Sequence, residues 1–306
     1  MLRQTGWLMD ELSPEDQFRL NVLLAQDIKA IRIDEPNLTL HALLGEGEAS
    51  MPLHPNCRPD KYFRILREHL SGHALGSPGG YPVYLSRWTR HGQVESDNLG
   101  HLLLIGEPEA VIAVVHSPAL TDTIAGYAWW TMPTIENARL MLMREAVAKG
   151  RMGAILTEFL VEHLPFLQEE HLAIMDTVAV LLYAGTLSPD QREATWRRGK
   201  RQNSYYVAFL EMCPDGLTEQ QFVEACIDIL NRPETQEVVT RTLDAIGRHF
   251  STSGQEGNVD ARTRLAQVSS TLTNPIFARS TAIGSLMRRK IEPVTSPILA
   301  DLALLK

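Results

Sequence analysis

The chain has 306 residues, of which 44% are hydrophobic and 22% are charged, and its formal net charge at pH 7 is −8. This composition is typical of a folded protein and excludes an intrinsically disordered chain. The sequence pI of about 5.7 argues against a protein dedicated to nucleic-acid binding.

The number of cysteines and the lack of long apolar runs indicate the expected cellular compartment. Cys57, Cys213 and Cys226 are too few and too scattered to form a disulfide framework. No run of 18 apolar residues is present, so the sequence predicts no membrane association. The N-terminus lacks the apolar core of a signal peptide. We therefore expect a cytoplasmic protein in a reducing compartment.

The N-terminal part predicts a small α+β section. Residues 1–12 are expected to be a loosely held tail, and the section itself covers residues 13–92. Ser13 followed by Pro14 has the pattern of a helix cap and first turn. Short extended runs follow at residues 30–34, 37–44 and 49–53. The last two flank a glycine-rich turn at residues 45–48, which predicts a β-hairpin to which the first run adds a third strand.

The stretch from Cys57 to Gly92 is basic within an acidic chain, with six lysines and arginines against two acids. From residue 58 to about residue 71 the apolar side chains share one helical face, which predicts a helix that ends at Gly72. Residues 73–80 are expected to form a loop because they are rich in glycine. A second short helix is expected over residues 81–91.

From residue 93 to residue 306 the sequence predicts a helical array. Proline-containing breaks recur at Pro118, Pro165 and Pro214, which are 47 and 49 residues apart. This spacing lies in the range of HEAT-like repeats, whose helix pairs bury their apolar faces by stacking. Further breaks are expected at Pro275, Pro293 and Pro297. The predicted fold class is therefore mostly α, an irregular HEAT-like helical array preceded by a small α+β N-terminal section with a β-hairpin.

No catalytic or cofactor motif is present in the sequence. Ser77 lies in a glycine-rich turn, but Pro78 follows it and removes the backbone N–H that an oxyanion hole would use. His69 and His73 are four residues apart, but we expect Gly72 to break the helix between them, which argues against a shared metal site. The glycines lack the Gly-Lys-Ser/Thr sequence of a phosphate-binding loop. We expect no cofactor, no metal and no catalytic residue.

The remaining candidates for function are binding residues in the basic stretch. Histidines and arginine guanidinium groups can hold an anion, and arginine beside tryptophan can engage RNA or an acidic partner. The candidate residues are His69, His73, Ser77, Arg87, Trp88 and Arg90. Two further basic segments lie at residues 196–201 and 287–290. The alternative is that these basic residues complement helix ends and solubilise the surface.

Five segments of the sequence, taken together, carry a resemblance to a known family. The longest, at residues 70–90, reads Leu-Ser-Gly-His-Ala-Leu-Gly-Ser-Pro-Gly-Gly-Tyr-Pro-Val-Tyr-Leu-Ser-Arg-Trp-Thr-Arg. The others lie at residues 12–25, 106–111, 128–130 and 144–147. Together they resemble the DsrS family, proteins of the dissimilatory sulfite reductase gene cluster of sulfur-oxidising bacteria. The resemblance runs from about Leu12 to about Leu217.

This resemblance implies a soluble cytoplasmic accessory protein of dissimilatory sulfur oxidation without an assigned activity, and it carries over no catalytic residue. We expect a non-catalytic regulatory factor that binds a protein partner of the sulfur-oxidation system, with RNA as the alternative partner. The second hypothesis is a small-molecule or anion-handling enzyme that uses Cys57, His69, His73, Ser77 and Arg87. That hypothesis requires these side chains to converge in one pocket.

Overall fold

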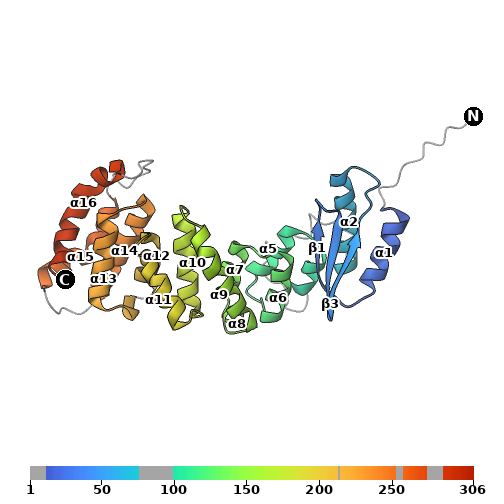
Figure 1. Ribbon diagram of the computed structural model, residues 1–306, viewed down its shortest axis with the longest axis horizontal. Coiled ribbons are helices and arrows are strands. Elements are labelled where there is room, and N and C mark those ends of the chain that lie inside the picture. Colours follow the sequence, from blue (N-terminus) through green and yellow to red (C-terminus); the bar gives the residue numbers. More distant parts are fainter. Residues whose placement is uncertain (1–11, 76–98, 213, 253–257, 274–284) are drawn as a thin grey trace, which may run out of the picture. The chain divides into compact units, whose positions relative to one another are not determined.

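The computed structural model describes residues 12–75, 99–212, 214–252, 258–273 and 285–306. The chain forms two compact units, Met1–Leu156 and Thr157–Lys306. The described residues form fourteen α-helices and one three-stranded antiparallel sheet near the N-terminus (Figure 1). The predicted fold class, mostly α with a hairpin-containing N-terminal section, is confirmed. The boundary expected at residue 92 lies outside the described residues, so that division into domains stays a prediction.

The first unit begins with a sheet that packs against two helices. Its elements are α1 Pro14–Leu24, β1 Ile28–Asp34, β2 Thr39–Leu44, β3 Gly47–Pro52 and α2 Pro59–Leu75. The predicted cap is present, because Ser13 Oγ accepts a hydrogen bond of 3.1 Å from the backbone N–H of Asp16. The strands pair in the order β1-β2-β3. A shared apolar cluster joins the sheet to both helices through residues such as Leu20, Leu40 and Leu66.

Helix α2 continues through Gly72 to Leu75, so the predicted helix end at Gly72 is wrong. A glycine inside a helix costs only about 1 kcal/mol relative to alanine. Gly72 is exposed, whereas Leu70, two residues earlier, is buried in the apolar cluster. The burial of the neighbouring side chains therefore outweighs the local preference of the glycine.

The rest of the first unit consists of short helices. They are the 3₁₀ helix η1 Gly100–Leu104, α5 Pro108–His116, α6 Asp122–Thr131, α7 Ile135–Leu142, α8 Glu145–Ala148 and α9 Arg151–His163, which contains the boundary between the units. Both η1 and α6 contact β1, so this strand is covered by helices. Asp122 holds the start of α9, since its carboxylate accepts the backbone N–H groups of Arg151 and Met152 at 3.1 and 2.9 Å.

The second unit is a stack of helices with a shorter repeat than expected. Its elements are η2 Leu164–Phe166, α10 His171–Ala184, α11 Pro189–Arg198, α12 Asn203–Met212, η3 Pro214–Gly216, α13 Glu219–Asn231, α14 Gln236–Thr252, α15 Val259–Ala266, η4 Val268–Thr273 and α16 Ser285–Ala303. Helix α12 contacts both α10 and α14. These three equivalent helices begin 32 and 33 residues apart, not 47. The prolines used to derive the longer spacing occupy non-equivalent turns, so their intervals do not measure the repeat.

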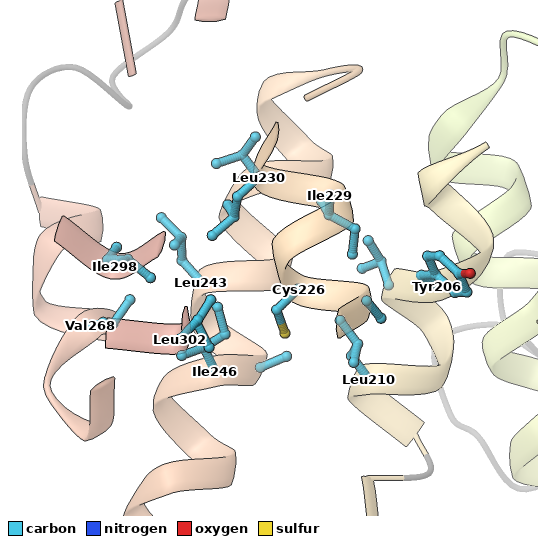
Figure 2. Close-up of a cluster of buried hydrophobic side chains, with 14 of the residues drawn as sticks. Tyr206, Leu210, Cys226, Ile229, Leu230, Leu243, Ile246, Val268, Ile298 and Leu302 are labelled. Atoms are coloured by element: carbon cyan, nitrogen blue, oxygen red, sulfur yellow. The ribbon is translucent and has the colours of Figure 1, made fainter. Parts of the chain in front are cut away.

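The apolar core of the second unit lies between α12, α13, α14, η4 and α16. Figure 2 shows Leu210 of α12 directed toward α13, and Leu302 of α16 near Ile246 of α14. Cys226 lies inside this cluster, and burial raises the pKa of its thiol. A thiol kept protonated in an apolar core acts as a packing group, not as a nucleophile.

Helix α16 runs through Pro293 and Pro297, so the expected breaks at these two prolines are wrong, while Pro275 lies outside the described residues. The two prolines are four residues apart and both are exposed. The carbonyl groups that lose their helical partners belong to Arg289 and Pro293, and both residues are exposed, so these carbonyl groups are accessible to water. On the opposite side Ile291 and Ile298 are buried and hold the helix on the core.

Candidate functional site

Of the six residues predicted to form a binding site, the structure describes two. His69 and His73 lie four residues apart on α2. Burial, and to a smaller extent the neighbouring His73, lowers the pKa of His69. The other four, Ser77, Arg87, Trp88 and Arg90, lie outside the described residues, so the predicted grouping stays a prediction.

The histidine pair shares a helical face because Gly72 does not interrupt α2. The predicted break at Gly72, which argued against a shared metal site, is therefore wrong. Two imidazoles supply half of the ligands of a tetrahedral site. Within the described ranges, however, no group of three or more His, Cys, Asp or Glu side chains is placed to hold a metal ion.

A buried carboxylate links the start of α1 to the start of α2. Asp16 accepts hydrogen bonds from the Tyr62 hydroxyl at 2.6 Å and from the backbone N–H of His54 at 2.9 Å. The Nδ1 atom of the His54 ring lies 3.0 Å from the other carboxylate oxygen. Burial raises the pKa of Asp16, but these hydrogen bonds outweigh it and leave that pKa below its usual value. Cys57 follows His54 by three residues. It is half-buried against the apolar cluster that joins the sheet to α1 and α2.

This Asp16 cluster stabilises the fold and does not have the geometry of a nucleophilic site. Its carboxylate, on α1, contacts three groups: the backbone N–H and the ring of His54 in the segment after β3, and the hydroxyl of Tyr62 on α2. The apolar packing of Cys57 favours a structural thiol. The sequence did not predict the cluster, because Asp16 reads as one of the acidic residues that favour the first turn of any helix.

A serine, a histidine and a glutamate meet in the second unit. His171 Nδ1 lies 2.8 Å from Ser204 Oγ and 3.2 Å from Glu234 Oε2, and Ser204 Oγ donates to the same glutamate at 3.3 Å. A catalytic triad requires the serine and the carboxylate on opposite ring nitrogens. Here both approach Nδ1, and Ser204 is fully buried. The arrangement is therefore not a catalytic triad.

The same cluster holds three helix starts together. Glu234 precedes α14, while His171 and Ser204 lie in the first turns of α10 and α12. The carboxylate of Glu234 also accepts the backbone N–H of Asn203 at 2.7 Å. Free N–H groups at helix N-termini favour a negative charge beside them. The three stacked helices therefore run parallel, with their N-termini joined by one carboxylate.

Substitution of Glu234 by alanine should lower the free energy of unfolding of the second unit by about 2 kcal/mol, because it leaves the buried backbone N–H of Asn203 without its acceptor and removes one of two partners of the buried Ser204 hydroxyl. The matched control is Glu237→Ala, since Glu237 is exposed in the first turn of α14. It should change the free energy by a few tenths of a kcal/mol. Urea denaturation of both variants measures the difference. Equal effects would contradict the assigned role of Glu234.

An ionic ladder crosses the stacked helices on one side. Arg241 of α14 donates through Nε to Glu211 Oε1 of α12 at 2.8 Å and through Nη1 to Asp176 Oδ1 of α10 at 3.0 Å. Its third nitrogen, Nη2, donates to the second carboxylate oxygen of Glu211. These hydrogen bonds raise the pKa of Arg241. A bidentate arginine with a second carboxylate fixes the spacing of the three helices.

Exposed apolar side chains flank this ladder on α10. Leu172 is 50% exposed and Tyr183 is 63% exposed. Together with Asp176 they follow the spacing of a single helical stripe. We define the α10–α14 face as Leu172, Asp176, Tyr183, Glu211 and Arg241. Because Asp176 is both in the stripe and in the ladder, the apolar and ionic groups lie on one surface.

The α10–α14 face is the candidate functional site, and the sequence did not reveal it. Apart from Asp176 and Thr177, residues 174–183 are apolar, and periodicity alone does not separate buried from exposed positions when both are apolar. Ile174, Val178 and Leu181 are fully buried, whereas Leu172 and Tyr183 are not. The one sequence feature that could have indicated the exposed side of α10 was the position of the charged residue Asp176 within this apolar run.

In the basic segment at residues 196–201, considered above as a possible contact for RNA or an acidic partner, the tryptophan packs inside the unit. The ring of Trp196 packs against the rings of Tyr206 and Phe209, with centroids 4.5 and 5.2 Å apart. A tryptophan used in this way does not offer a free face to a nucleic-acid base. Arg197 forms an ion pair with Glu193 within α11. This geometry favours the alternative that the segment stabilises a helix end.

No protein-family model, curated protein or solved structure matches this chain. Across the described segments, none of the helices has the length and apolar character needed to span a membrane.

Proposed function

We propose that this protein is a non-catalytic accessory factor of dissimilatory sulfur oxidation in the cytoplasm, and that it binds a protein partner through the α10–α14 face. The pathway comes from the resemblance of the sequence to the DsrS family. The binding role is supported by one observation, the exposure of Leu172 and Tyr183 beside an ordered ionic ladder.

This face has the chemical make-up of a protein interface. Protein interfaces combine a few aromatic and aliphatic anchors with polar groups around them. Tyr183 offers a large ring and a hydroxyl, and Leu172 offers an aliphatic anchor on the same stripe. Arg241, Glu211 and Asp176 are held by each other, so little side-chain entropy is lost when a partner covers them. Stacked helical repeats present extended surfaces of this kind.

The anchors provide the test of this proposal. The tagged full chain is used to capture proteins from a sulfur-oxidising bacterium, recovered proteins are identified by mass spectrometry, and the affinity of the purified partner is then measured. The double variant Leu172→Glu/Tyr183→Glu should bind that partner at least about tenfold more weakly, because two anchors are replaced by charges.

The matched control is Val259→Glu, an exposed apolar residue on α15. This variant should retain binding within about twofold, since Val259 lies outside the α10–α14 face. Circular dichroism checks that all variants are folded. Recovery of no sulfur-oxidation protein, or equal binding by the double variant, would reject the proposal. Loss of recovery after ribonuclease treatment would identify RNA as the partner instead.

A further inference from the structure

A separate pocket of about 620 Å³ lies in the first unit, among β1, α2 and the ends of neighbouring helices. This size falls within the range of small-molecule sites. The side chains that matter for its chemistry are Arg32, Asp34, Glu35, Arg67, Glu107 and Met132. They come from β1 and the turn after it, from α2, from the residue before α5, and from the residue after α6.

One part of the pocket carries excess negative charge. Arg67 lies between two carboxylates, since its Nη2 donates to Glu35 and its Nε is 2.8 Å from Glu107 Oε1. Glu107 is buried. Asp34 adds a third carboxylate, and hydrogen bonds from Asn37 hold the pKa of Asp34 below its usual value. The lining supplies three carboxylates and two guanidinium groups, those of Arg67 and Arg32, so one negative charge is in excess and favours a further positive group.

Another part of the pocket presents the guanidinium group of Arg32. The Arg32 guanidinium lies over the ring of Trp130, with its carbon 4.9 Å from the ring centroid, and it donates to the Trp130 carbonyl at 3.3 Å. The Trp130 indole is itself held by Glu48 at 2.7 Å. In the part of the chain that the structure describes, no ion pair involves Arg32. Its remaining N–H groups are suited to a carboxylate.

Arg32 and Asp34 lie close to each other, and the pocket also has an apolar lining. Arg32 and Asp34 are two residues apart on β1, so their side chains leave the same side of the strand about 7 Å apart. Ile33, Val111 and Met132 also line the pocket. A ligand that fits must therefore carry a positive group, a negative group and an apolar part within a short distance.

We infer that this pocket binds a free α-amino acid with an apolar side chain. Its carboxylate pairs with Arg32, its ammonium group lies against the carboxylates of Asp34, Glu35 and Glu107, and its side chain contacts Val111 and Met132. A peptide presents only one of the two charged groups at either terminus, so it satisfies only one part of the pocket. This site is independent of the α10–α14 face.

Isothermal titration calorimetry of the full chain with the standard amino acids tests this inference. We expect binding of leucine, methionine or another apolar member. If leucine binds, leucinamide, which lacks the carboxylate, and N-acetyl-leucine, which lacks the ammonium group, should each bind at least about tenfold more weakly. Absence of binding by every amino acid would overturn the inference. Equal binding of N-acetyl-leucine would also overturn it, because the site would then recognise a simple anion.

Variants locate the site. Arg32→Met and Asp34→Asn should each weaken binding at least about tenfold, since each removes one charge complement. The control Arg19→Met removes an arginine that pairs with Glu15 on the surface of α1 and should leave affinity unchanged. If Arg32→Met does not fold, Arg32→Lys keeps the charge but loses the planar fork, and weaker binding by several fold is expected. Unchanged affinity in a folded Arg32 variant would overturn the assignment.

Discussion

Substitution of Phe222 by alanine is expected to lower the free energy of unfolding of the Thr157–Lys306 unit by about 3–5 kcal/mol, the usual cost of truncating a buried phenylalanine. Phe222 is fully buried in the core of α12, α13 and α14. Its ring stacks on His249 at 4.0 Å between centroids and meets Phe250 edge-on at 6.1 Å. The loss therefore combines transfer free energy, a cavity and aromatic contacts.

Hydrogen exchange of peptides from α13 and α14 measures this effect within the second unit. Phe166→Ala is the matched control, because Phe166 belongs to the same unit but is 80% exposed. It should cost less than about 0.5 kcal/mol. Exchange rates that rise equally in both variants would show that Phe222 is not a core anchor, and would place the apolar core elsewhere.

The second large effect is expected at Asp16, where Asp16→Asn should destabilise the first unit by about 2 kcal/mol at pH 7. Hydrogen bonds to a charged acceptor are worth roughly 1.5–3 kcal/mol. The uncharged amide oxygen accepts more weakly from the Tyr62 hydroxyl and the His54 backbone N–H, and an NH₂ group replaces the oxygen that faces the His54 ring. Burial and the charge of Asp16 raise the pKa of Tyr62, so its hydroxyl stays protonated and donates.

The pH dependence of stability follows from the lowered pKa of Asp16. In the unfolded chain the carboxyl titrates near its ordinary value of 3.8, whereas in the folded chain it titrates below that value. Its stabilising contribution is therefore fully present above about pH 4 and is lost as the pH falls through the folded pKa. Denaturation curves between pH 7 and pH 2 should show this loss in the natural protein and a smaller one in Asp16→Asn.

Asp60→Asn serves as the control for Asp16, because Asp60 is also in the first turn of a helix but is exposed. Its substitution should change the stability at pH 7 by a few tenths of a kcal/mol. An Asp16→Asn variant as stable as the natural protein at pH 7 would contradict the role of the buried carboxylate.

Local signals were sufficient to predict the elements of the N-terminal sheet. Alternating residues and a glycine-rich turn identify β2 and β3, which pair with Leu44 opposite Gly47. Ser13 before Pro14 identifies the start of α1. These features depend on interactions within a few residues, so they can be read from the chain itself.

The predictions that helices end at Gly72, Pro293 and Pro297 were wrong because contacts distant in the sequence override the local preference of these residues. Each residue disfavours a helix locally, and each lies on an exposed side of a helix whose other side is buried. The free energy of that burial comes from residues distant in the sequence. The repeat length was misjudged in the same way, because the 32- and 33-residue spacing becomes clear only when α10, α12 and α14 lie side by side.

The sequence by itself determined the fold class, because apolar periodicity, caps and turns are local properties of the chain. Only the tertiary structure decided which apolar residues are exposed and which charges meet. Leu172 and Val178 have similar character in the sequence, yet only Leu172 faces outward. Likewise Asp176 and Arg241 are 65 residues apart and meet only because three parallel helices stack. Binding surfaces depend on such distant contacts, so the candidate site required the structure.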